Sequence, residues 1–148
     1  MKMKRRDPLL YGFVLILLTL FCSCSSVKFT PGGRIVKDTY SKSYPTDFLS
    51  FHPQINTALQ DYARTHKGNS FQVARLGGDA VVIRGRYQRD GEPDRFFANV
   101  TATPAGLSKT SVQIKISATN PEASSETLER AAGELFRIIE TGTGIRPE

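Results

Sequence analysis

Apolar and polar residues alternate most regularly between Ser111 and Thr119. Val112, Ile114 and Ile116 are apolar, and polar residues separate them. A period of two places the apolar side chains on one face, so this pattern predicts a strand with one buried face. Comparable patterns occupy residues 70–76, 80–87 and 95–103, which makes three or four strands.

Short turn sequences join these segments, namely Gly77-Gly78-Asp79, the exposed residues 89–94 and Pro104-Ala105-Gly106. Parallel strands need a crossover of about a dozen residues or more, so the short connections predict an antiparallel meander. A further strand is expected at residues 39–44, at an edge of the sheet, because Pro45 has no backbone donor and ends it.

Two segments have the spacing of helices. In the first, Ile55, Leu59 and Tyr62 form one apolar stripe. Because Pro53 fits best in a first turn, this helix is expected to start near residues 50–52 and to stop at Lys67-Gly68. The second helix is expected at residues 124–141, before Gly142, with an apolar stripe of Leu128, Ala132, Leu135 and Ile139.

These elements predict an α+β fold in the order β-α-β-β-β-α. The expected architecture is a two-layer sandwich, in which an antiparallel meander of about four strands carries both helices on one face. Residues 39–148 are expected to form a single domain, because a chain of this length can bury one core.

The N-terminal residues have another pattern. Lys2, Lys4, Arg5 and Arg6 precede an uncharged run of 13 residues from Leu9 to Phe21. A basic end and a short apolar run are typical of a secretory leader, and the run is too short to span a bilayer. The only cysteines are Cys22 and Cys24, so no disulfide is expected within the domain.

The residues Phe21-Cys22-Ser23-Cys24 resemble the lipobox of bacterial lipoproteins. The resemblance implies a signal peptide over residues 1–23, a lipidated N-terminus at Cys24 and a flexible tether over residues 24–38. Ser23 supplies the small residue that the peptidase needs before the cut, so Cys24 is a better candidate than Cys22. An ordinary secretory leader and a retained membrane anchor remain as alternatives. Serine at position 25, where aspartate often signals inner-membrane retention, implies the outer membrane, facing the periplasm.

The element order, with Tyr44-Pro45 at the end of the first strand, resembles a group of small bacterial lipoproteins of unknown function. The similarity covers most of residues 24–142. The order is also similar to that of the outer-membrane lipoproteins that assist lipopolysaccharide assembly, although Ser25-Ser26 stands where that family has glycine and an aromatic residue. Both resemblances imply a fold and a location, and they carry over no functional residues.

Charge favours acidic partners only mildly. The formal net charge is +6, but the leader holds four basic residues and one acidic residue, leaving 16 basic and 13 acidic residues in the rest. Anionic glycolipid, anionic lipid or an envelope protein are therefore the expected partners, besides the membrane that holds the lipid anchor. Nucleic acid is not expected for an exported protein.

Candidate chemistry is sparse. His52 and His66 lie at opposite ends of the first helix, about 20 Å apart at 1.5 Å per residue, so no shared metal site is expected. No nucleophile, acid–base pair or cofactor motif is evident, and the acidic residues Asp90, Glu92 and Asp94 are expected in a solvated turn.

One basic group stands out. Arg84 and Arg86 fall on the same face of a strand, and Lys115 lies on the polar face of a later strand, so together they are a candidate face for an anionic partner. A charged, solvated sheet surface is the alternative. The expected function is a non-enzymatic binding or assembly module. An envelope enzyme with a carboxylate and arginine site assembled from loops is the other possibility.

Overall fold

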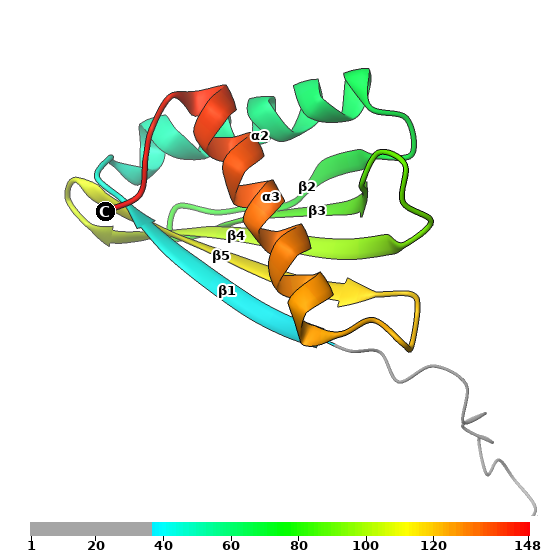
Figure 1. The fold of residues 1–148 in the computed structure, drawn as a ribbon. Coiled ribbons are helices and arrows are strands. Elements are labelled where there is room, and N and C mark those ends of the chain that lie inside the picture. Colours follow the sequence, from blue (N-terminus) through cyan, green and yellow to red (C-terminus); the bar gives the residue numbers. More distant parts are fainter. Residues whose placement is uncertain (1–36) are drawn as a thin grey trace, which may run out of the picture. The chain divides into compact units, whose positions relative to one another are not determined.

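The computed structural model describes residues 37–148, so the predicted signal peptide, Cys22 and Cys24 lie outside the described residues. These residues form one open antiparallel sheet of five strands, with two helices on one face (Figure 1). The strands are β1 (Lys37–Tyr44), β2 (Ser70–Leu76), β3 (Val81–Gln88), β4 (Arg95–Gly106) and β5 (Lys109–Ala118), and the helices are α2 (Phe48–Thr65) and α3 (Ser125–Thr143).

The predicted α+β class, with two helices and antiparallel pairing, is confirmed, but the strand count is five rather than four. The order along the chain is β-α-β-β-β-β-α, one strand more than predicted. The reason is that all four segments after α2 join the same sheet, as successive antiparallel hairpins.

The strands lie in the order β1-β5-β4-β3-β2. The first strand of the domain therefore pairs with the last, from Lys37 opposite Ser117 to Tyr44 opposite Thr110. This pairing leaves β1 and β2 as the two edges, which confirms the predicted edge position of β1. The strand begins at Lys37, two residues earlier than expected.

The core lies between the sheet and the two helices. Val112, Ile114 and Ile116 are buried, as their alternation predicted, and the neighbouring strand β4 buries Phe96, Ala98, Val100 and Ala102. The helices cover this face with their own apolar stripes, whose buried residues are Phe48, Phe51, Ile55, Leu59, Leu128, Leu135, Phe136 and Ile139.

Helix α2 begins at Phe48, earlier than the predicted residues 50–52. Asp47 caps this end, because its carboxylate accepts the backbone N–H of Ser50 at 2.9 Å. Pro53 is consequently the sixth residue of the helix and not part of its first turn. Its missing N–H leaves the Leu49 carbonyl without a helical donor, and Leu49 is 71% exposed, so water can solvate that end.

Helix α3 continues through Gly142, which was expected to end it. Gly144 is the actual cap, in the left-handed conformation with φ 70°. Gly142 instead lies against Ala58 of α2, where an added Cβ would be 2.4 Å from the alanine methyl. Neither α2 nor α3 is long and apolar enough to cross a bilayer.

Strand β4 extends to Gly106, so the predicted turn at residues 104–106 is also wrong. Pro104 pairs with Thr110, and the register shifts between Pro104 and Gly106. A bulge of this kind accommodates a residue that cannot donate to the ladder. The hairpin turns instead at residues 107–108, where Leu107 is fully exposed.

Candidate functional site

The candidate site is the outer face of the sheet, meaning the face directed away from α2 and α3. Residues directly opposite one another on paired strands point to the same side of a sheet. Arg84 lies opposite Asn99, and Asn99 lies opposite Lys115. In the next outward row, Arg86 lies opposite Phe97. All three predicted basic residues are exposed, and the alternation of β3 places them opposite the buried face.

The spacing of these cations follows from strand geometry. Arg84 and Arg86 are two residues apart, about 6.6 Å along one strand. Arg84 and Lys115 are separated by one strand, about 9.6 Å at the usual spacing of 4.8 Å. The structure thus brings the three residues onto one surface, with the Asn99 amide between two of them. They form an array and do not converge on a single point.

The outer face carries further cations and, within the described strands, no acidic side chain. Arg95 pairs with Gln88 and Arg75 with Val82, which places both in outward rows. Asp38, the one carboxylate within these strands, lies opposite the buried Ile116 and accepts from the hydroxyl of Tyr40 on the helix side. Besides Lys109, which pairs with Glu148, the outward cations of the strands β2 to β5 are Arg75, Arg84, Arg86, Arg95 and Lys115.

None of these five cations makes an ion pair with the residues that the structure describes, whereas other basic residues do. Lys42, for example, reaches Glu140 at 2.8 Å, and Arg89 reaches Glu134 at 3.0 Å, both on the helix side. Arginine guanidinium groups present a planar fork that matches phosphate or carboxylate. These five cations are therefore free to bind anions, and the described strands direct no acidic side chain outward that would repel them.

Phe97 adds an apolar element among the cations. Its side chain is 51% exposed, beside Arg86 on the neighbouring strand. Two open hollows lie along this part of the face, with volumes of about 370 and 270 Å³. Ser70 and Arg86 line both of them, and Phe97 lines the first.

The sequence predicted Arg84, Arg86 and Lys115 as residues of a face for an anionic partner, but it assigned no binding role to Arg95 or Phe97. The available signal was the pair Phe96-Phe97, because adjacent residues of a strand face opposite sides and only one aromatic ring can enter the core. Arg89, which flanks the same turn as Arg95, does not join the outer face. Its guanidinium pairs with Glu92 at 2.9 Å and with Glu134.

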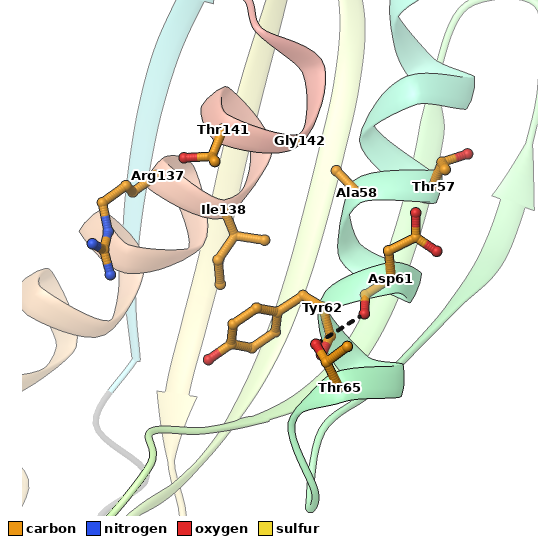
Figure 2. Close-up of a pocket in the computed structure, with 9 residues that line it drawn as sticks. All are labelled: Thr57, Ala58, Asp61, Tyr62, Thr65, Arg137, Ile138, Thr141 and Gly142. Atoms are coloured by element: carbon orange, nitrogen blue, oxygen red, sulfur yellow. Dashed lines mark hydrogen bonds between the residues drawn. The ribbon is translucent and has the colours of Figure 1, made fainter.

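A second hollow region lies between the helices (Figure 2). The helices approach closely at Ala58 and Gly142 and leave an open groove of about 490 Å³, which Tyr62, Ile138 and Arg137 help to line. Asp61 also lines it, but its carboxylate is paired with Arg64 at 2.8 Å. The groove has apolar walls and one cation, Arg137, without an ion pair to the described residues.

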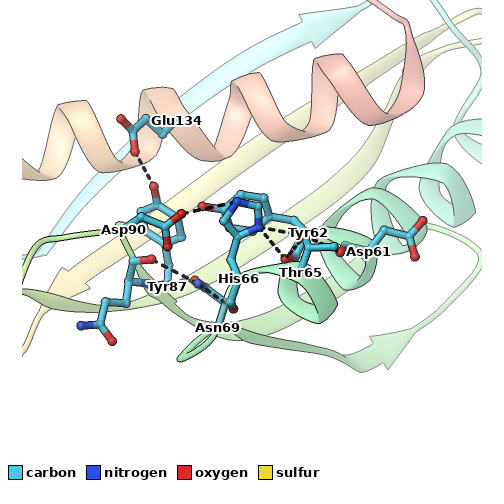
Figure 3. A network of polar contacts seen from close by, with 9 residues as sticks. Asp61, Tyr62, Thr65, His66, Asn69, Tyr87, Asp90 and Glu134 are labelled. Carbon is cyan, nitrogen blue, oxygen red and sulfur yellow. Dashed lines mark hydrogen bonds and ion pairs between the residues drawn. The ribbon is translucent and has the colours of Figure 1, made fainter.

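A polar network closes one end of the core (Figure 3). The hydroxyl of the buried Tyr87 donates to Glu134, which also binds Arg89. Burial, and then the Glu134 carboxylate, raise the pKa of Tyr87 above its usual range. The tyrosine is therefore a neutral donor, and these three residues satisfy one another.

Both histidines pack against aromatic rings close to them in the sequence. The ring of His66 stacks on Tyr62 with 3.9 Å between centroids, and its Nε2 lies 3.5 Å from an Asp90 oxygen (Figure 3). His52 packs against Phe48 at 5.0 Å near the start of the same helix. Among the described residues, no group of three or more His, Cys, Asp or Glu side chains is placed to hold a metal ion.

Comparison with known proteins assigns no family. No protein-family model matches the chain, and no curated protein matches it significantly. Among solved structures, the alignment with the Mll3558 protein of Rhizobium loti has 16% identity, covers 72% of this chain and 96% of that one, and has a TM-score of 0.41.

Two further alignments are similarly distant. A START superfamily protein from Mycobacterium smegmatis has 11% identity, with 73% and 94% of the two chains covered and a TM-score of 0.37. The Zhui aromatase/cyclase from Streptomyces sp. R1128 has 10% identity, with 74% and 92% covered and a TM-score of 0.37. At these scores the alignments support no functional assignment.

Proposed function

We propose that this chain is a lipid-anchored lipoprotein of the bacterial cell envelope, and that its domain binds an anionic partner without converting it. The observation that carries the binding role is the outer face, where five cations lack ion pairs to the described residues and the described strands direct no acidic side chain outward. The anchor rests on the leader and on Ser23-Cys24. Outer-membrane attachment, facing the periplasm, rests on Ser25.

The form of the face favours binding over catalysis. A catalytic site needs groups that converge on a reacting atom, usually in a cleft that excludes water. The cations here are spread over four strands, and the hollows between them are open. The tyrosine, carboxylate and guanidinium of the network at Tyr87 bind one another and leave no free member to act on a substrate.

The proposal is tested by capture of partners from native envelopes. The wild-type lipoprotein is compared with Arg84→Glu/Arg86→Glu and with a control, Arg130→Glu/Arg137→Glu, which makes the same charge change on exposed positions of α3. Loss of captured anionic material in the first variant and retention in the control is the expected result. Because exposed ion contacts are each worth about 0–1 kcal/mol, capture should weaken as salt rises.

Two results would contradict the proposal. Equal capture by the two double variants would show that the outer face does not bind the anionic partner. If mass spectrometry found no acyl group on the mature N-terminus, the proposed lipid anchor would be disproved.

A further inference from the structure

The first residue of the domain lies at one end of the sheet, and this position determines which end of the outer face is near the N-terminal segment. Strand β1 starts at Lys37, which lies opposite Ser117, and Ser117 lies opposite Phe97. The same row continues to Arg86 and Ser70. The N-terminal segment therefore joins the domain at the end of the sheet where Phe97 and Arg86 lie.

Only 12 residues separate Cys24 from Lys37. A random-coil chain of 12 residues spans roughly 20 Å, by the relation for glycine-rich chains. At physiological salt, exposed charges interact over about 8 Å, so a domain on so short a tether samples the field of the membrane surface repeatedly. The end of the sheet that carries Phe97 and Arg86 is the end held closest to the anchor.

The outer face combines basic side chains with an exposed aromatic ring, as surfaces that bind anionic lipid do. Basic side chains near such a surface are attracted to headgroup phosphates, and an exposed aromatic ring among them is stable at the boundary of headgroups and acyl chains. Arg84, Arg86 and Lys115 supply the cations over neighbouring strands, and Phe97 supplies the ring. Five strands at about 4.8 Å also make a broad surface, which fits an array of headgroups better than one small anion.

We propose that the outer face of the sheet docks onto the anionic lipid surface to which the chain is tethered, with Phe97 at the leading end. This inference rests on the proposed function, because it takes the lipidated Cys24 as the anchor. Docking directs the groove between α2 and α3 away from the membrane, since the helices cover the opposite face of the sheet. The sheet face is then the membrane side of the domain, and the helices form its free side.

The test measures which face approaches lipid. The native cysteines are the leader residue Cys22 and the lipidated Cys24, so a cysteine introduced elsewhere is the only free thiol of the mature lipoprotein. A fluorophore is attached at Gln113→Cys on the outer face or at Thr141→Cys on α3, both exposed positions. The protein is reconstituted in vesicles of brominated phosphatidylcholine, with or without phosphatidylglycerol, and quenching by bromine is recorded.

Stronger quenching at position 113 than at position 141, only in vesicles with phosphatidylglycerol, is expected. Arg84→Glu/Arg86→Glu should abolish this difference, whereas Arg130→Glu/Arg137→Glu should retain it. Phe97→Ser should reduce it, while Leu107→Ser, which changes an exposed residue in the hairpin turn after β4, should not.

Equal quenching at the two positions, or a difference that survives Arg84→Glu/Arg86→Glu, would overturn lipid docking. If envelope capture still depended on Arg84 and Arg86 in that case, a protein or a soluble anion would be the partner and the proposed binding function would stand. Failure of the anchor itself is recognised separately, because mass spectrometry of the mature N-terminus would then find no acyl group.

Discussion

Gly142 of α3 lies directly against Ala58 of α2, so close that a Cβ on the glycine would sit 2.4 Å from the alanine Cβ and 3.1 Å from its Cα. Both residues line the groove between the helices (Figure 2). The absence of a side chain at Gly142 therefore sets how closely the two helices approach. It also gives Gly142 a packing role that offsets the stability a glycine costs inside a helix relative to alanine.

Replacement of Gly142 by alanine should destabilise the domain, although alanine favours helices. The new methyl group would overlap Ala58, and overpacking of this kind lowers the free energy of unfolding by about 1–3 kcal/mol. Gly133, in the same helix, is the matched control because nothing lies within 4 Å of its added Cβ. Gly133→Ala should raise stability by about 0.5–1 kcal/mol, and urea denaturation measures both changes. The combination Ala58→Gly/Gly142→Ala should recover part of the loss, and failure to do so would refute the contact.

Substitutions at Ile114 and Gln113 test which face of β5 is buried in the core. Its side chain is fully buried in the middle of β5, whereas the adjacent Gln113 is exposed on the outer face. Ile114→Asp should lower the free energy of unfolding by about 3 kcal/mol or more, because it removes apolar burial and introduces an unpaired charge. Gln113→Asp should change it by less than about 0.5 kcal/mol. Thermal melts of the two variants with equal midpoints would show that the buried face is misassigned.

The buried tyrosines predict a loss of stability in alkali. Burial, then nearby carboxylates, raise the pKa of Tyr44 and Tyr87 above the usual value, and burial with Asp38 raises that of Tyr40 to about 12. Because the unfolded chain releases these protons near pH 10, the unfolded state binds fewer protons than the native state above that pH. The contribution of these tyrosines to stability should therefore be constant below about pH 9 and be lost as the pH rises above about 10.

Urea denaturation at a series of pH values measures this fall, and tyrosinate absorbance reports ionisation. The phenol of Tyr87 should ionise together with unfolding, and Tyr87→Phe should flatten the alkaline slope. If Tyr87 titrated near pH 10 in the folded protein, its burial and its bond to Glu134 would both be contradicted.

Cys24 should be the lipidated residue. Cys24→Ser is expected to leave an unprocessed precursor without acyl chains, because the resemblance to the lipobox makes Cys24 the acceptor. Cys22→Ser is the matched control and should be processed normally, since position 22 precedes the cut. Mass spectrometry of the mature N-terminus measures both outcomes. Processing of the Cys24→Ser chain to an acylated product at Cys22 would reverse the assignment.

Local periodicity determined the main elements of this domain. The alternation around Ile114 identified β5 and its buried face, and the stripe containing Leu128 and Leu135 identified α3. These predictions succeeded because the repeat of apolar positions is a property of one segment, and burial of that repeat is what the segment needs from any fold. The basic residues Arg84 and Arg86 were placed on one face for the same reason.

Exact boundaries depended on contacts that no single segment contains. Gly142 reads as a helix stop in the sequence, but in the structure it is a contact surface for Ala58, some 84 positions away. Pro53 reads as the first turn of α2, yet the burial of Phe48 in the core starts the helix earlier. In both cases tertiary packing outweighed the local preference of the residue.

The sequence by itself therefore determined the α+β class, the two helices, the faces of the strands and the basic character of one of them. Only the tertiary structure decided that five strands share one sheet, that β1 pairs with β5, and that Arg95 and Phe97 join Arg84 and Arg86 on the outer face. The physical reason is that hydrophobic periodicity specifies which face of a strand is buried but not which strand lies beside it. That choice is made by the packing of the whole core, and it places the start of the domain in the same row of the sheet as Phe97, one strand away.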